Sequence, residues 1–169
     1  MSLEVVKVKQ LHPAGKLPTR AYDSAGYDLS SRDEAFILRP GETRLINLGI
    51  AAEFTADHVV LFRDRSSLGK AGCTVFGGVI DADYRGEWRV TLHNANRRGL
   101  FGWVRKLLEP LTGKIEPGAL IVRQGDKIAQ ALFLPIGRPE CQWYGELSPS
   151  SRGQAAYGST GSPVSNLRG

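Results

Sequence analysis

The chain has 169 residues and a formal net charge of +5, with 41% hydrophobic and 23% charged residues. This length is most simply one domain with a real hydrophobic core, and the composition is ordinary for a globular protein. The first apolar run contains Glu4 and Lys7, and no stretch approaches eighteen uncharged apolar residues. These features argue against a secretory signal and a membrane span, so we expect a cytoplasmic protein.

The positive charge is dispersed along the chain. Lys and Arg form no basic run interleaved with aromatic side chains, the pattern of many nucleic-acid-binding segments. The net charge indicates an anionic partner, and a small polyanion such as a triphosphate fits it as well as nucleic acid does. We expect no stable nucleic-acid binding.

Alternation of apolar and polar residues with a period of two dominates the chain. Trp88, Val90 and Leu92 alternate with polar residues, and residues 45–50 alternate in the same way. Many short strands separated by Pro and Gly predict an all-β fold, an antiparallel β sandwich or barrel. The other β-rich runs lie at 4–9, 35–39, 58–63, 119–123 and 128–136.

Cysteine and histidine form no recognisable site pattern. Cys73 and Cys141 lie far apart without a CxxC pair, and we interpret them as two buried thiols. His12, His58 and His93 match no HExxH motif, so no zinc site built by the protein is expected.

The most informative segment runs from Gly77 to Glu87 and reads GGVIDADYRGE. Its two glycines supply the backbone freedom for a tight hairpin, and a β-branched pair begins the strand that follows. Asp81 and Asp83 share one strand face unless a turn intervenes. The segment combines a hairpin that could read a flat ligand, a carboxylate that could activate water and an aromatic ring. Taken alone, it also fits a surface turn with solvated acids.

Residues 97–118 depart from the β pattern. Apolar side chains recur at helical spacing over 100–108, and Pro110 follows as a stop, which predicts a short helix near 99–109. Two interpretations remain open: a helix packed on its own sandwich, or a helix that docks on a partner or a membrane surface.

The last residues, 148–169, are rich in Ser, Gly and Pro and poor in apolar anchors. Their composition predicts a flexible C-terminal arm behind a β domain of residues 1–147. Arg152 nevertheless offers a permanent cation, and the Gly158–Gly161 run offers two hydroxyls and backbone amides that glycine leaves accessible. These are the groups that bind a phosphate.

Five motifs follow one another along the chain: SAGYDL at 24–29, DRSSLG at 64–69, GGVIDADYRGE at 77–87, GDKIAQ at 125–130 and RGQAAYGSTG at 152–161. In this order they resemble the homotrimeric dUTP pyrophosphatases (dUTPases), over about residues 18–161. The resemblance implies a jelly-roll-like fold, hydrolysis of dUTP to dUMP and pyrophosphate, Mg²⁺ as cofactor and a homotrimer. Any one motif is weak evidence, whereas all five in register are very specific.

By this resemblance Asp81 is the base that orients and deprotonates the water attacking the α-phosphorus. The ring of Tyr84 lies against the deoxyribose, where a ribose 2′-hydroxyl would clash. Backbone groups of the hairpin match the edge of uracil, and some relatives add an asparagine side chain that is absent here. The residues assigned to this recognition are Val75, Gly78, Val79 and Ile80.

The resemblance assigns the phosphates to other motifs. Arg65, Ser66 and Ser67 match the second motif, although the family often has glycine where Ser67 stands. Gln130 matches a glutamine that contacts phosphate and water. Asp28 matches an aspartate that meets the metal only through water, so we expect Mg²⁺ to be held mainly by substrate oxygens.

The fifth motif lies in the arm. By resemblance it grips the γ-phosphate, and an aromatic ring, usually phenylalanine, stacks on uracil. Alanines at 155–156 replace the usual glycine pair, which puts easy closure of the arm in doubt. The residues concerned are Arg152, Tyr157, Gly158, Ser159 and Thr160.

Two alternative functions are considered. The dCTP deaminases share the fold and an Arg-Ser-Ser-Leu motif, but their catalytic glutamate corresponds to Thr91 here, and they lack the Ile-Asp-Ala-Asp-Tyr run. The second alternative is a nucleotide-binding regulatory protein. It would act through residues 97–118, where relatives usually have a short turn, so a protein partner at this insertion is a further possibility.

Overall fold

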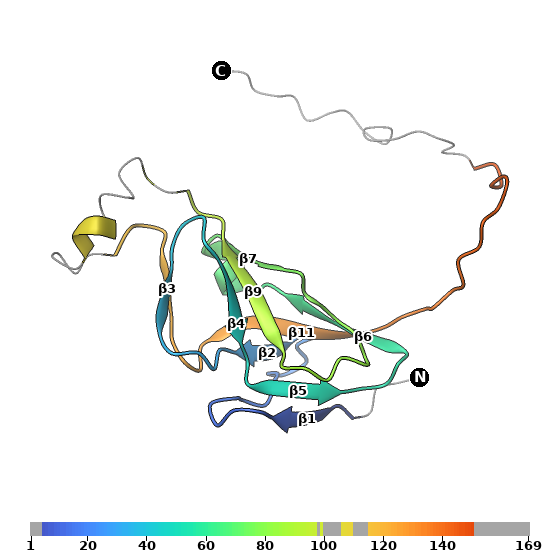
Figure 1. Cartoon of the computed structure of the whole chain (residues 1–169), viewed down its shortest axis with the longest axis horizontal. Coiled ribbons are helices and arrows are strands. Elements are labelled where there is room, and N and C mark those ends of the chain that lie inside the picture. Colours follow the sequence, from blue (N-terminus) through green and yellow to red (C-terminus); the bar gives the residue numbers. More distant parts are fainter. Residues whose placement is uncertain (1–4, 98, 100–105, 110–114, 151–169) are drawn as a thin grey trace, which may run out of the picture. The chain divides into compact units, whose positions relative to one another are not determined.

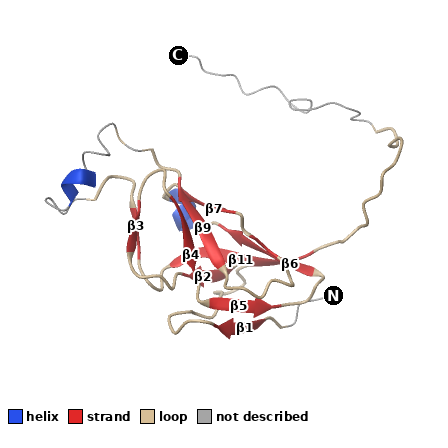
Figure 2. Cartoon of the chain, viewed as in Figure 1, coloured by secondary structure: helices blue, strands red, loops and turns tan. Residues whose placement is uncertain are grey.

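The computed structural model describes residues 5–97, 99, 106–109 and 115–150. By its internal contacts the chain divides into two units, one ending at Gly137 and one beginning at Arg138. Figures 1 and 2 show strands as the dominant elements of the first unit. The elements are β1 (Lys7–Gln10), β2 (Tyr27–Ser30), β3 (Phe36–Leu38), β4 (Thr43–Asn47), β5 (Ile50–Glu53), β6 (His58–Arg63), α1 (Ser66–Lys70), β7 (Cys73–Phe76), β8 (Val79–Ile80), β9 (Arg89–Asn94), β10 (Leu120–Val122) and β11 (Lys127–Pro135).

The strands form antiparallel sheets of four, three, two and two strands. The four-stranded sheet has the order β2-β11-β6-β8 and the three-stranded sheet the order β4-β9-β7. The predicted all-β antiparallel fold is confirmed. Strand β11 lies between β2 and β6, although it is the last of the named strands.

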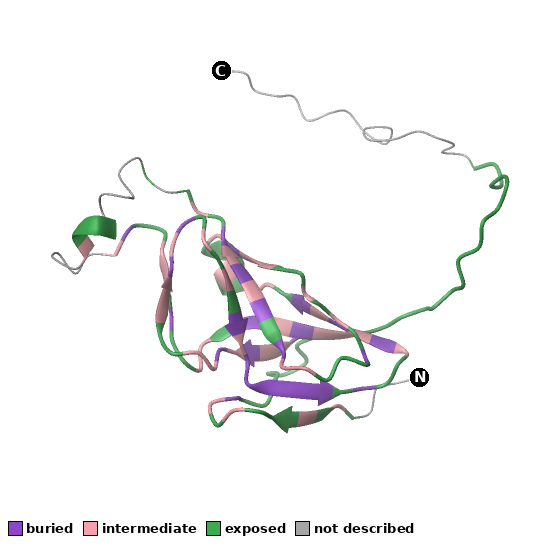
Figure 3. Ribbon diagram, viewed as in Figure 1, coloured by how far each residue is buried: buried purple, intermediate pink, exposed green. Residues whose placement is uncertain are grey.

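The core contains side chains from the two larger sheets and from β3, β5 and β10. Trp88, Val90 and Leu92 are fully buried, as their alternation predicts. Figure 3 shows buried positions alternating with less buried ones along strands such as β9. The Trp88 ring meets the Phe62 ring of β6 edge to face, with centroids 5.4 Å apart. Each such burial contributes about 1.5–3 kcal/mol to the free energy of folding. Strand β9 is thereby fixed in register, and so is the turn that precedes it.

The alternation over 45–50 does not form one strand. Strand β4 ends at Asn47 and β5 begins at Ile50, because Gly49 has a φ of 71°, in the left-handed region. The chain bends there from the sheet of β4 into pairing with β1.

Residues 106–109 are helical, in agreement with the C-terminal part of the predicted helix. Residues 100–105 lie outside the described residues. Arg39 donates to Glu109 at 2.5 Å and to Glu116 at 3.5 Å, so the end of this helix is tied to the segment between β3 and β4. Leu107 is exposed. A protein partner at 97–118 stays a prediction.

The described part of the second unit, residues 138–150, is exposed and contains no helix or strand. The interpretation of two buried thiols is wrong for Cys141, which is exposed here, whereas Cys73 is buried in β7. No helix among the described residues is long and apolar enough to cross a membrane. The cytoplasmic location and the arm at 148–169 stay predictions.

Candidate active site

Two motifs from opposite ends of the chain meet in the four-stranded sheet. Gln130 of β11 pairs with Asp28 of β2 on one side and with Arg63 of β6 on the other. The first and fourth motifs therefore lie side by side, and the second motif begins one residue beyond Arg63.

Asp28 is held by two cations. Its carboxylate accepts hydrogen bonds from Arg65 Nε at 2.8 Å and Lys127 Nζ at 2.7 Å. Burial raises the pKa of Asp28, but the hydrogen bonds from Lys127 and Arg65 and their charges outweigh burial and lower it. Sequence reasoning missed Lys127, although its place in the GDKIAQ motif was a usable signal.

The Gln130 side chain occupies space that is free only because residue 26 is glycine. A Cβ atom on Gly26 would lie 2.1 Å from Gln130 Oε1, which is shorter than any real contact. The Nε2 of Gln130 donates to the backbone carbonyl of Asp64 at 2.7 Å. The glutamine thus fastens the start of the second motif to β11.

The second motif is also fixed from the side of β7. Asp64 accepts hydrogen bonds from the Val75 amide at 2.6 Å and from the Thr74 hydroxyl at 3.2 Å. Arg65 is the N-cap residue of α1, and Ser66 and Ser67, in the first turn of that helix, are exposed. Both hydroxyl-bearing residues are accessible to a ligand, whereas the Val75 amide is occupied within the protein.

The Gly77–Gly78 step carries the chain from one sheet to another. Strand β7 pairs with β9, whereas β8 pairs with β6, so the expected hairpin is a corner between sheets. Gly77 has a φ of 58°, and a Cβ on Gly78 would lie 2.5 Å from the Phe62 carbonyl oxygen. The corner therefore requires glycine at both positions for different reasons.

A pocket of about 240 Å³ opens beside this corner. A turn follows Ile80, in which the Tyr84 amide donates to the Asp81 carbonyl at 3.1 Å. Because of this turn Asp81 lines the pocket, whereas Asp83 does not belong to its described lining. Tyr84 is 36% exposed. The lining consists of Leu45, Gly77, Val79, Ile80, Asp81, Tyr84, Glu87, Arg89 and Thr91.

The pocket and the Asp28 cluster lie at different places on the four-stranded sheet. Ile80 pairs with Val60 of β6, so Asp81 stands four residues along β6 from the row of Asp28 and Gln130. It is also three strands away from Asp28 in the order of the sheet. At roughly 3.3 Å per residue and 4.8 Å per strand, Asp28 and Asp81 are about 20 Å apart. Asp28 and Asp81 therefore lie at separate places on the four-stranded sheet of one chain.

The arm residues Arg152, Tyr157, Gly158, Ser159 and Thr160 lie outside the described residues. The structure therefore describes four of the five motifs in two groups. One group contains Asp28, Arg65, Lys127 and Gln130, and the other contains Asp81, Tyr84 and the corner at Gly77–Gly78.

The family model described as dUTPase matches residues 14–101 of this chain. A protein of Nautilia profundicola is 34% identical over 160 residues, covering 92% of this chain and 98% of the relative. A protein of Anaeromyxobacter sp. is 35% identical over 165 residues, with coverages of 95% and 98%. Both are named deoxyuridine 5'-triphosphate nucleotidohydrolase. The chain belongs to the dUTPase family.

Solved dUTPase structures have the same fold. A mutant dUTPase of Staphylococcus bacteriophage 80alpha with dUpNHpp superimposes with a TM-score of 0.79 at 25% identity, covering 93% of this chain and 98% of that one. The dUTPase from phage phi11 of S. aureus, which has a species-specific insert, gives a TM-score of 0.71 at 25% identity, with coverages of 85% and 98%. The fold and the family resemblance are thus confirmed, and the individual site residues stay predictions.

Proposed function

We propose that this protein hydrolyses dUTP to dUMP and pyrophosphate. The observation that carries the proposal is the pocket at the Gly77–Gly78 corner, into which the turn brings Asp81 together with Tyr84. Membership of the dUTPase family supports it. So does the phage 80alpha structure, which contains the triphosphate analogue dUpNHpp.

In the proposed reaction, water attacks the α-phosphorus. Asp81 is exposed in the pocket, so its carboxylate can orient the water and accept its proton. A bond forms between the water oxygen and the α-phosphorus, and the bond from that phosphorus to the bridging oxygen breaks. Pyrophosphate leaves with the bonding electrons, and cationic side chains such as Arg65 offset the charge on the phosphate oxygens.

Recognition of the nucleoside is proposed at the same corner. Phe62 donates its amide to the Gly78 carbonyl at 2.6 Å, which holds this backbone rigid beside the pocket. A rigid edge of backbone donors and acceptors suits uracil and leaves cytosine with unpaired groups. The Val75 amide is already bonded to Asp64, so the recognising amides are proposed at Gly78, Val79 and Ile80.

Mg²⁺ is the proposed cofactor. Among the described residues, no group of three or more His, Cys, Asp or Glu side chains could hold a metal ion. Asp28 already accepts from Arg65 and Lys127, yet each carboxylate oxygen retains a lone pair that can accept from a metal-bound water. These residues therefore fit an ion held mainly by substrate phosphates, with Asp28 contacting its water. Such an ion would neutralise charge on the phosphate oxygens.

The proposed active assembly is a homotrimer with sites at subunit boundaries. The separation of about 20 Å between Asp28 and Asp81 supports this assembly, since a site shared between subunits would bring both carboxylates to one nucleotide. In each site, one subunit would supply the group formed by Asp28, Arg65, Lys127 and Gln130, and another subunit would supply the Asp81 pocket. The arm of a subunit would supply residues 152–160.

The decisive assay measures pyrophosphate release from dUTP with Mg²⁺, beside UTP, dTTP and dCTP. Selective turnover of dUTP is expected. Ammonia release from dCTP would instead identify a deaminase, and binding of dUTP without turnover would favour a regulatory protein.

The subunit arrangement is tested by mixing two inactive proteins, Asp81→Asn and a chain truncated after Ser150. After subunit exchange, activity is expected to return in part, because some sites pair an intact Asp81 with another chain's arm. A mixture that stays inactive after confirmed exchange would refute sites shared between subunits. Light scattering is expected to give about three times 18.4 kDa.

A further inference from the structure

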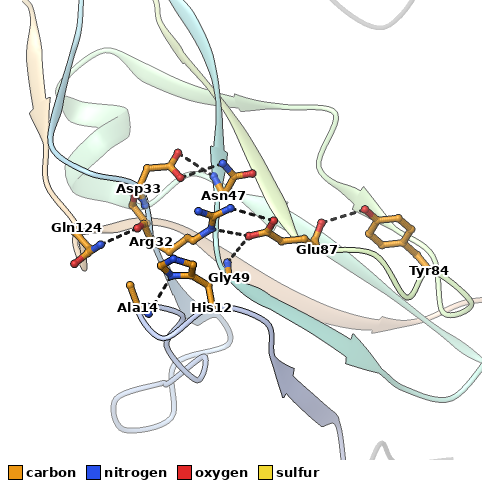
Figure 4. A network of polar contacts seen from close by, with 10 residues as sticks. His12, Ala14, Arg32, Asp33, Asn47, Gly49, Tyr84, Glu87 and Gln124 are labelled. Atoms are coloured by element: carbon orange, nitrogen blue, oxygen red, sulfur yellow. Dashed lines mark hydrogen bonds and ion pairs between the residues drawn. The ribbon is translucent and has the colours of Figure 1, made fainter.

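Glu87 joins the turn that carries Asp81 and Tyr84 to two distant segments of the chain (Figure 4). Its carboxylate accepts hydrogen bonds from Arg32 Nε at 2.9 Å and from the Gly49 amide at 2.8 Å. Its backbone carbonyl accepts a hydrogen bond from the Tyr84 hydroxyl at 3.0 Å. One residue therefore connects the pocket tyrosine to the segment after β2 and to the bend between β4 and β5.

Arg32 is itself held on both sides of its backbone. Its amide donates to the Asn47 carbonyl at 2.9 Å, and its carbonyl accepts from Gln124 Nε2 at 2.9 Å. The guanidinium thus projects toward Glu87 from a fixed position. The side chains of Arg32 and Glu87 are 27% and 24% exposed, so water and salt screen this ion pair less than a surface pair.

The Tyr84 ring is connected to Glu87 at its hydroxyl end. A Cβ atom on Gly86 would lie 2.4 Å from the Tyr84 hydroxyl oxygen, so the ring end lies directly against Gly86. The hydroxyl is anchored to the Glu87 carbonyl, while part of the ring faces the pocket. A shift of the Glu87 backbone would move the acceptor of the Tyr84 hydroxyl.

We propose that Glu87 and Arg32 are positioning residues that hold the Tyr84 ring where it selects deoxyribose over ribose. This inference rests on the proposed dUTP hydrolysis. It adds a specificity role to Glu87, the last residue of the third motif, and to Arg32, which lies outside the five motifs. A ring displaced by about 1 Å changes a sterically selective site strongly, because discrimination depends on close contact.

The inference is tested with Glu87→Ala, Arg32→Ala and the milder Glu87→Gln and Arg32→Lys, measuring kcat and KM for dUTP and UTP. The preference for dUTP over UTP is expected to fall about tenfold in the alanine variants. Arg32→Lys is expected to recover part of it, because lysine keeps the charge but not the planar guanidinium geometry.

Arg39→Ala is the matched control. Arg39 pairs with Glu109, and their side chains are 16% and 19% exposed, but the pair lies away from the pocket lining. This variant is expected to lower the melting temperature while leaving the dUTP-to-UTP preference unchanged. The inference would be overturned if kcat/KM fell equally for dUTP and UTP in the Glu87 and Arg32 variants, or if neither value changed. The pair would then have no role in sugar selection.

Amide hydrogen exchange on the full chain separates this inference from the proposed function. Without nucleotide, exchange at residues 81–87 is expected to accelerate in Glu87→Ala and Glu87→Gln but not in Arg39→Ala. A wild-type protein that leaves dUTP intact would refute the proposed function, and the exchange result would still decide whether Glu87 orders the turn. Unchanged exchange in both Glu87 variants would overturn the inference.

Discussion

Asp64 binds the backbone amide of Val75 at 2.6 Å and so ties the loop before α1 to strand β7. The carbonyl of the same residue accepts from Gln130, which brings β11 into the connection. The second motif, the fourth motif and strand β7 are therefore held together by one aspartate that has no predicted contact with substrate. The Val75 amide is engaged in this bond, which leaves base recognition to the corner beyond it.

Asp64→Ala is expected to destabilise the protein by about 2 kcal/mol, because the Val75 amide and the Thr74 hydroxyl lose their acceptor. Urea unfolding followed by circular dichroism measures the change. Asp83→Ala, at an exposed position, is the control and is expected to change stability by less than about 0.5 kcal/mol. If the free energy of unfolding fell by a similar amount in both variants, the hydrogen bond to Val75 would contribute no more to stability than an exposed residue does.

Asp81→Asn is expected to lower kcat for dUTP by roughly 10²–10⁴ while the fold and nucleotide binding persist, because the amide cannot accept the proton from water. Asp83→Asn is the matched variant, two residues away and outside the described pocket lining, and is expected to keep most activity. Steady-state kinetics with titrated dUTP binding provide the comparison. Near-normal turnover of Asp81→Asn would remove Asp81 from the mechanism.

Gly26→Ala is expected to cost about 1–3 kcal/mol of stability and to lower activity, since the new methyl group would displace Gln130. Gly69→Ala is the control, because a Cβ there meets nothing within 4 Å and alanine favours the helix. Thermal melts and dUTP turnover are compared for the two variants. Equal behaviour would mean that Gln130 moves aside without consequence.

Stability is expected to fall on acidification in a manner that depends on Glu87. The hydrogen bond from Arg32, assisted by the Gly49 amide, lowers the pKa of Glu87 below its ordinary value of 4.5 although burial opposes this. A lowered pKa in the folded state stabilises the protein above the unfolded pKa, and this contribution is lost as pH falls through the folded pKa.

The melting temperature is therefore expected to fall below about pH 4.5, and to fall less steeply in Glu87→Gln. Melting curves of both proteins at pH 7 to pH 3 test this expectation. Parallel pH profiles would show that Glu87 has the same pKa in the folded and unfolded states.

The local patterns of the sequence predicted the local structure well. The period-two alternation over 88–92 identified side chains that are buried in β9 and directly before it, and the motif order identified the dUTPase family. Pairings between distant segments were not predictable. Nothing in the spacing of Gly77 and Gly78 indicates that β7 and β8 join different sheets, since that depends on which strands are neighbours.

Two single residues illustrate the same limit. Gly49 interrupts an unbroken alternation, because its conformation is set by contacts with Leu11 and His12, whose amides donate to its carbonyl. Lys127 stands in the GDKIAQ motif, which marked it as a candidate, but its contact with Asp28 arises because β11 pairs with β2, and the charge pattern along the chain does not reveal that pairing.

The central place of β11 also has a consequence for biosynthesis. Asp28 and Gln130 are neighbours in the sheet but about 100 residues apart in the chain, and ribosomes supply this strand late. Until then, β2 and β6 lack the strand that joins them, so the unfinished sheet exposes two unpaired edges. Such long-range closure slows folding, and the nascent chain is therefore most prone to misassociate just before residues 127–135 emerge.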